Sequence, residues 1–185
     1  MKHVPNLLTA LRILLVPWIW KLLWDGEYAW VIGVGFVASM SDALDGWVAR
    51  KYSATSKLGA FLDPIGDKLM LSGAYLIFGL HGVVPIWLTW IVLGRDVLIL
   101  LSSVIAYLFT SIRDFPPSVW GKLSTLIQIL TALVILIHHS FAPGPTAETV
   151  EIGMIWLCAA MTCWSAAHYS FLAIHRLRGT APRDH

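Results

Sequence analysis

Residues 42–67 read DALDGWVARKYSATSKLGAFLDPIGD, and the arrangement of the whole chain can be worked out from this stretch. Apolar segments precede and follow it, each long enough to form a helix that crosses a bilayer. Four carboxylates, those of Asp42, Asp45, Asp63 and Asp67, therefore fall near the ends of two membrane helices. A charged group at membrane depth costs about 3 kcal/mol unless it is paired, bound to a metal or facing water. These four acids are therefore candidates for a functional site.

The composition of the chain excludes an ordinary soluble domain. Of 185 residues, 57% are hydrophobic and 13% are charged, and the mean hydropathy is +0.72. Soluble domains carry about 25% charged residues. Ten tryptophans suit a protein whose aromatic rings settle at the headgroup level of a bilayer. The formal net charge of +2 is too small to indicate a nucleic-acid partner. The sequence predicts an integral membrane protein.

Six apolar segments are long enough to span a membrane, and they predict an all-α, polytopic bundle of six transmembrane helices. Turn-forming residues separate them, and we find no internal repeat and no second domain, so residues 1–185 are expected to form one membrane domain. The predicted spans are 7–24, 28–50, 60–80, 84–110, 118–138 and 150–174.

The basic residues predict the orientation of the chain, because lysine and arginine concentrate in cytoplasmic loops. Arg50, Lys51 and Lys57 lie between the second and third spans, whereas the odd-numbered connections hold acids and no lysine or arginine. Both termini are therefore expected in the cytoplasm, with the protein in the cytoplasmic (inner) membrane. His138 and His139, near the outer end of the fifth span, are expected to be interfacial rather than a ligand set.

The spacing of the four acids indicates a metal site. Asp42 and Asp45 (i, i+3) would share one helix face, and so would Asp63 and Asp67 (i, i+4). Four carboxylates on two adjacent helices would repel one another, and a pair of divalent cations would relieve that repulsion. Ligation by oxygen alone favours magnesium, manganese or calcium over zinc.

Two other interpretations of the acids stay open. They could line the cytoplasmic mouth of the bundle, solvated or paired with Arg50, Lys57 and Lys68. They could also belong to an intramembrane transporter or channel for divalent metals. Four acids at this spacing favour a metal site over the first interpretation, and the transporter does not account for the glycines and arginine that accompany the acids.

Small residues and one arginine accompany the acids. Gly46 follows an aspartate directly, and Gly59 lies four residues before another, where a missing side chain lets a ligand approach the backbone. Arg50 is one turn beyond Gly46 and suits an anionic group. Close packing of membrane helices would also explain Gly46, Gly59 and Ala49, and Arg50 could be a cytoplasmic anchor.

Taken together, residues 42–67 resemble the signature D-x2-D-G-x2-A-R-x8-G-x3-D-x3-D of the CDP-alcohol phosphatidyltransferase family. Every fixed position is occupied, including the eight-residue gap. The resemblance implies a six-helix membrane enzyme, commonly a homodimer, that transfers a phosphatidyl group from CDP-diacylglycerol to an acceptor alcohol and releases CMP.

The resemblance also implies roles for individual residues. The four aspartates would ligate two divalent cations, Mg2+ or Mn2+, and Asp67 would take the proton of the acceptor hydroxyl. The nucleotide of the CDP-lipid would lie against Asp42, Gly46, Ala49 and Gly59, and Arg50 would hold its phosphates.

Resemblance to the cardiolipin synthase and phosphatidylglycerophosphate synthase branches extends beyond the signature. It includes residues 6–12 (NLLTALR), 94–97 (GRDV) and 121–125 (GKLST). The candidates from these stretches to bind the acceptor or a phosphate are Thr9, Arg12, Arg95 and Lys122. Each basic residue could instead pair with an acid or anchor its helix, and Arg95 beside Asp96 could be a structural pair.

The acceptor is predicted from the residues after Arg95. Members of the family that use glycerol 3-phosphate tend to have Arg-Glu here and a second arginine about two turns later, suited to a phosphomonoester dianion. This chain has Arg95-Asp96 and then no basic residue before Arg113. The difference favours phosphatidylglycerol as the acceptor, which gives cardiolipin, with glycerol 3-phosphate as the alternative.

Overall fold

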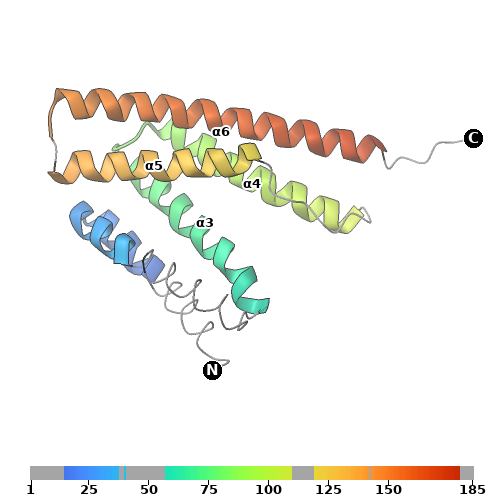
Figure 1. The fold of residues 1–185 in the computed structure, drawn as a ribbon, viewed down its shortest axis with the longest axis horizontal. Helices are drawn as coiled ribbons and strands as arrows, with labels where there is room; N and C mark the ends of the chain where they lie inside the picture. Colours follow the sequence, from blue (N-terminus) through green and yellow to red (C-terminus); the bar gives the residue numbers. More distant parts are fainter. Residues whose placement is uncertain (1–14, 38–39, 41–56, 110–118, 142, 180–185) are drawn as a thin grey trace, which may run out of the picture.

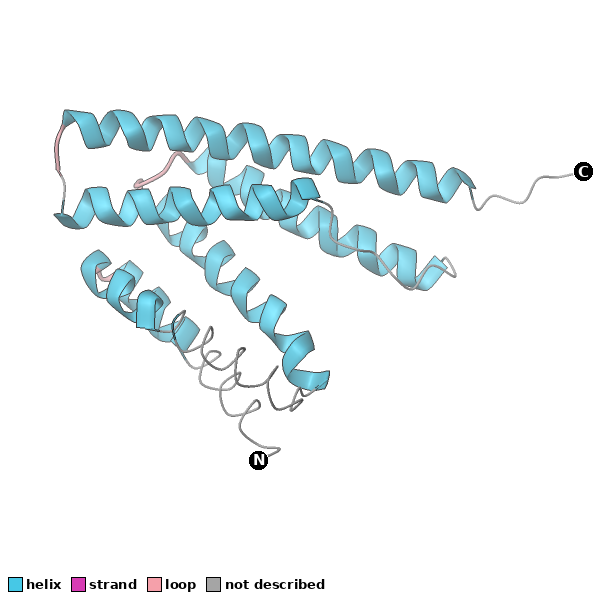
Figure 2. Cartoon of the chain, in the orientation of Figure 1, coloured by secondary structure: helices cyan, strands magenta, loops and turns pink. Residues whose placement is uncertain are grey.

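We describe a computed structural model of the chain, covering residues 15–37, 40, 57–109, 119–141 and 143–179. For 57–67, 102–109 and 172–179 only the backbone is described. All regular elements in these ranges are helical (Figures 1 and 2), as the composition predicts. Two helical segments, 15–24 and Tyr28–Val37, precede four longer helices. These are α3 (Lys57–Leu80), α4 (Ile86–Phe109), α5 (Val119–Phe141) and α6 (Pro145–Gly179).

Two tight turns end helices in the described part of the chain, and each contains a glycine in the left-handed region. Gly26 has φ 77° after the first helix, and Gly82 has φ 70° after α3. At the second turn, the N–H of His81 donates to the carbonyl of Ile77 and the N–H of Val83 to that of Phe78. Glycine takes this conformation without a steric penalty, which is why both helices end where the sequence has Asp-Gly or His-Gly.

The long helices pack so that α6 lies along α5 and also contacts α4, while α3 crosses beneath them to touch α4 and α5 (Figure 1). The centre of the bundle is formed by Tyr75 and Phe78 of α3, which are fully buried. The hydroxyl of Tyr75 donates to the backbone carbonyl of Gln128 at 2.9 Å, so this contact ties α3 to α5.

The distribution of polarity in α5 is the reverse of that in a soluble protein. Its inward face is largely polar or small, and its outward face is a stripe of large apolar side chains. The inward residues are Gly121, Ser124, Gln128, Thr131, Ala132, Ile135 and Leu136. The outward stripe contains Val119, Leu123, Leu126, Leu130, Leu133 and Ile137.

Two helical stretches, Val119–Phe141 and Pro145–Phe171, are long and apolar enough to cross a membrane. Only 33% of each apolar window is buried, which is unlike the core helix of a soluble protein. Lipid would cover the exposed apolar face, and the helices satisfy their own backbone groups. The structure therefore favours a bundle embedded in a membrane.

The predicted spans coincide with the helices to within a few residues for α3, α4 and α5. The predicted span 150–174 lies within α6, which is longer and runs from Pro145 to Gly179. The first turn of α6 is polar and precedes the apolar run. Proline in the first turn of a helix lacks only a donor that would be unsatisfied there, and Glu148 faces the positive end of the helix dipole.

Candidate active site

The second half of the signature lies on the first half of α3. Gly59, Asp63 and Asp67 follow one another at intervals of one helical turn, so their positions fall along one side of the helix. The other signature residues lie outside the described residues, as do two of the candidates for acceptor binding. These are Asp42, Asp45, Gly46, Ala49 and Arg50 of the signature, together with Thr9 and Arg12.

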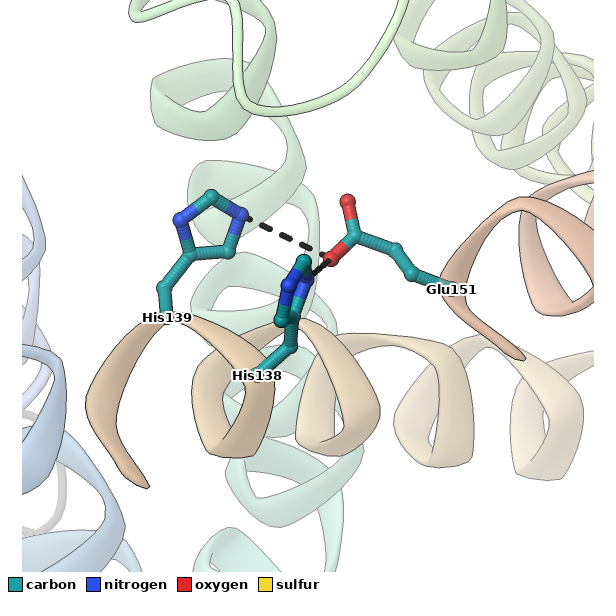
Figure 3. A group of neighbouring side chains, drawn as sticks. All are labelled: His138, His139 and Glu151. Atoms are coloured by element: carbon teal, nitrogen blue, oxygen red, sulfur yellow. Dashed lines mark hydrogen bonds and ion pairs between the residues drawn. The ribbon is translucent and has the colours of Figure 1, made fainter. Parts of the chain in front are cut away.

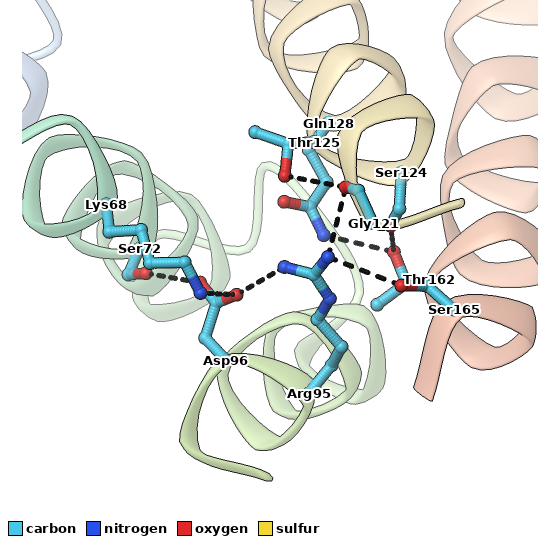
Figure 4. Close-up of polar contacts among 10 residues, drawn as sticks. All are labelled: Lys68, Ser72, Arg95, Asp96, Gly121, Ser124, Thr125, Gln128, Thr162 and Ser165. Atoms are coloured by element: carbon cyan, nitrogen blue, oxygen red, sulfur yellow. Dashed lines mark hydrogen bonds and ion pairs between the residues drawn. The ribbon is translucent and has the colours of Figure 1, made fainter. Parts of the chain in front are cut away.

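A charged network begins one residue after Asp67. The ammonium of Lys68 on α3 lies 2.7 Å from Oδ1 of Asp96 on α4, and the hydroxyl of Ser72 donates to Oδ2 of Asp96 at 3.0 Å (Figure 4). The Asp96 side chain is 10% exposed. One carboxylate therefore accepts from two positions of α3, four residues apart, and fixes this helix against α4.

Arg95 joins the same carboxylate to α5 and α6. Its Nη1 lies 2.8 Å from Oδ1 of Asp96, and its Nη2 donates to the carbonyl of Gly121 at 3.1 Å and to Oγ of Ser165 at 3.3 Å. Figure 4 shows the guanidinium of Arg95 between α4, α5 and α6. Its side chain is 4% exposed, so the structural pairing considered from the sequence is present.

Polar side chains continue the network toward the middle of the bundle. The hydroxyl oxygen of Thr162 on α6 accepts from the amide nitrogen of Gln128 at 3.1 Å and from the hydroxyl of Ser124 at 3.4 Å. All three residues are buried. Buried polar groups in lipid-embedded helices need such partners, and these bonds hold α5 and α6 in one register.

Arg95 and Lys122 were both candidates to bind a phosphate, and the structure places them differently. Arg95 is enclosed in the network, whereas Lys122 is exposed near the start of α5, one residue after the buried Gly121. Lys68, Arg95 and Asp96 together carry one net positive charge if all are ionised, immediately beyond Asp67 along α3. That charge can offset nearby carboxylates or attract an anion.

Four residues of the network, Ser72, Gln128, Thr162 and Ser165, are not predicted from the sequence. The available signal was their position in apolar runs, where a polar side chain needs a partner. Sequence alone could not identify those partners, since they are 24 to 70 residues apart.

Comparison with known proteins identifies the family of the chain. Residues 2–164 match the sequence model of the CDP-alcohol phosphatidyltransferase family. A CDP-diacylglycerol–glycerol-3-phosphate 3-phosphatidyltransferase of Pseudomonas fluorescens is 35% identical over 90% of this chain and 88% of its own. A protein of the same name from Blochmanniella floridana is 30% identical over 91% and 90%. Cardiolipin synthase (CMP-forming) of Rattus norvegicus is 26% identical over 95% of this chain, which spans 64% of the rat protein.

Proposed function

The chain belongs to the CDP-alcohol phosphatidyltransferase family, and from this premise we propose that it transfers the phosphatidyl group of CDP-diacylglycerol to a glycerol-type alcohol. The acceptor oxygen would attack the phosphorus that carries the diacylglycerol. The bond from that phosphorus to the oxygen of CMP would break, and the proton of the acceptor hydroxyl would pass to the enzyme. The observation that carries the proposal is the complete signature of residues 42–67 within the family match.

The donor set of the signature fits two Mg2+ or Mn2+ ions. Asp42, Asp45, Asp63 and Asp67 offer carboxylate oxygens only, which these cations prefer, and Asp63 and Asp67 occupy successive turns of α3. When bound, the cations supply positive charge that neutralises the phosphates and the leaving group. Asp67 would accept the proton of the acceptor hydroxyl, a role that depends on its position because a carboxylate is normally a weak base.

The remaining signature residues would bind the nucleotide. Gly46, Ala49 and Gly59 leave room for the cytidine moiety of the CDP-lipid beside Asp42, and Arg50 would hold its phosphates. The Lys68–Asp96–Arg95 network fixes the helix that carries Gly59, Asp63 and Asp67 against the rest of the bundle.

We propose phosphatidylglycerol as the acceptor and cardiolipin as the product. The guanidinium of Arg95 is enclosed by Asp96, Gly121 and Ser165, and the described side chains that follow it on α4 include no second arginine. A phosphomonoester dianion would therefore find little free positive charge on this helix. The 35% identity with the Pseudomonas fluorescens protein favours the second candidate, glycerol 3-phosphate.

We also propose the membrane topology that the sequence predicts, because it gives both substrates access to the site. Six spans in a cytoplasmic membrane, with both termini in the cytoplasm, would place the signature acids where a water-soluble nucleotide and a lipid tail can both reach them. The enzyme is proposed to act as a homodimer.

The test is a parallel assay of purified protein in mixed micelles. CDP-diacylglycerol is supplied with Mg2+ or Mn2+ and either phosphatidylglycerol or glycerol 3-phosphate, and the lipid products are separated. Release of CMP with formation of cardiolipin is expected. Phosphatidylglycerophosphate as the main product would show that the acceptor is glycerol 3-phosphate instead. Absence of CMP release with both acceptors, together with metal flux into proteoliposomes that cytidine nucleotides do not affect, would favour the transporter.

A further inference from the structure

A second group of ionisable side chains lies at the C-terminal end of α5, away from the candidate active site. Nδ1 of His138 is 2.5 Å from Oε2 of Glu151 on α6, and Nε2 of His139 is 3.5 Å from the same oxygen. Figure 3 shows both rings turned toward this carboxylate. Adjacent residues on a helix point about 100° apart. Both rings meet Glu151, which reaches across from α6, and this contact between helices is not visible in the sequence.

This group is separate from the candidate active site. His138 follows Gly121, which accepts from Arg95, by 17 residues along α5. At 1.5 Å per residue this is about 25 Å, most of the thickness of a bilayer core. The group lies beside the turn between α5 and α6, and the ring of His139 contacts Tyr28, with centroids 5.8 Å apart.

The three side chains are held in place before any ligand binds. The exposed fractions of the side chains are 10% for Glu151, 17% for His138 and 35% for His139. The carboxylate is therefore largely buried, and the His139 ring is partly exposed at the surface of the protein. The rings of His138 and His139 also contact each other, with centroids 4.9 Å apart. Side chains fixed in this way lose little conformational entropy on binding.

The donor atoms have the chemistry of a zinc site. Two imidazole nitrogens and a carboxylate oxygen form a His2Glu set, in contrast to the all-oxygen set of the signature. One donor atom from each residue lies within 4.8 Å of the others. Tetrahedral ligands at zinc distances are about 3.3 Å apart. The contact between His139 and Glu151 already has this spacing, and the hydrogen bond from His138 would have to open by about 1 Å.

We propose that His138, His139 and Glu151 form a Zn2+ site that joins the outer ends of α5 and α6. Water would complete the coordination, because the described structure brings only three protein donors together here. A cation that binds only the folded protein stabilises the helical hairpin, and the proposal does not depend on which reaction the signature performs.

The experiment measures zinc binding by the full-length protein, purified in detergent with a tag that contains no histidine. Several millimolar Mg2+ is present to occupy oxygen-only sites. We expect about one zinc per chain in the wild type and at least a tenfold weaker affinity in Glu151→Gln and in His139→Ala. His81→Ala is the matched control, since His81 is an exposed histidine at the same end of the bundle, and it should retain zinc.

Two further measurements keep the result decisive if a variant fails to fold. X-ray absorption of the wild-type zinc complex should show imidazole ligands at about 2.0–2.1 Å, whereas a shell of oxygen alone would place zinc at the acids and overturn the proposal. Zinc at one hundred times its Kd should shift the unfolding equilibrium of the wild type about a hundredfold toward the folded state. No zinc binding under excess Mg2+, or equal binding by all variants, would reduce the group to a hydrogen-bonded contact.

Discussion

Lys68 and Asp96 form an ion pair between α3 and α4, with Nζ and Oδ1 2.7 Å apart. Lys68 directly follows Asp67, the residue proposed as the base, and Asp96 directly follows Arg95, which reaches α5 and α6. Asp96 and Arg95 together thus connect the helix that carries two of the signature acids to α4, α5 and α6. This contact adds to the hydrogen bond of Tyr75 with α5 in holding α3 in the bundle.

Asp96→Asn should destabilise the fold strongly. The substitution keeps the size of the side chain but leaves the ammonium of Lys68 and the buried guanidinium of Arg95 without their counter-charge. Removing one partner of a buried ion pair costs about 3–5 kcal/mol. Thermal unfolding in detergent should show a large loss.

Asp25→Asn is the matched control for this experiment. Asp25 pairs with Lys21 at the surface, where the side chains are 42% and 71% exposed. Exposed pairs contribute less than about 1 kcal/mol. Equal stability of the two variants would contradict the structural role assigned to Asp96.

Thr162→Val should loosen the contact between α5 and α6. Valine has nearly the shape of threonine but cannot accept the hydrogen bonds from Gln128 and Ser124, and both donors are buried. Each buried donor left without a partner costs about 1–3 kcal/mol. Ser170→Ala removes a hydroxyl of α6 that, among the described residues, bonds within its own helix, to the carbonyl of Ala166, and should have a much smaller effect. A similar loss in both variants would contradict the proposed inter-helix role.

The sequence alone predicts those parts of the fold that depend on local signals. The apolar run at 84–110 follows the His81-Gly82 turn almost directly, and both signals are local. For this reason α4 begins within two residues of its predicted start. The first turn of α6 lies outside the apolar run that predicts the span, because it is polar, although Pro145 and Glu148 are themselves local signals for the start of a helix.

In the candidate site, too, local features could be predicted from the sequence and contacts between helices could not. Its acids could be found from their spacing, because the signature occupies one continuous stretch. The pairing of Asp96 with the neighbouring Arg95 could be suggested from the sequence, but its partner Lys68, 28 residues away, could not, and neither could the contact of His138 on α5 with Glu151 on α6, 13 residues away. Contacts between helices depend on their rotation and register, which hydropathy does not specify.

Gly73→Ala should force apart the first helical segment and α3. A Cβ at this position would lie 2.2 Å from the indole of Trp20, so a whole ring would have to move. Overpacking of this kind costs about 1–3 kcal/mol. Gly153→Ala is the control, because nothing lies within 4 Å of its added methyl group and alanine favours a helix by up to about 1 kcal/mol over glycine. Unchanged stability of Gly73→Ala would contradict the close approach of Trp20.

Asp67→Asn should abolish turnover while leaving the protein folded. The change removes the proposed proton acceptor and one carboxylate ligand but retains the size of the side chain at a position early in α3. Loss of a general base lowers rates by about 10²–10⁴-fold, so CMP release should fall at least that far. The thermal unfolding midpoint should stay near that of the wild type, which separates this variant from Asp96→Asn. If Asp67→Asn released CMP at the wild-type rate, the base would have to be another group, and the remaining signature acids would be the first to test.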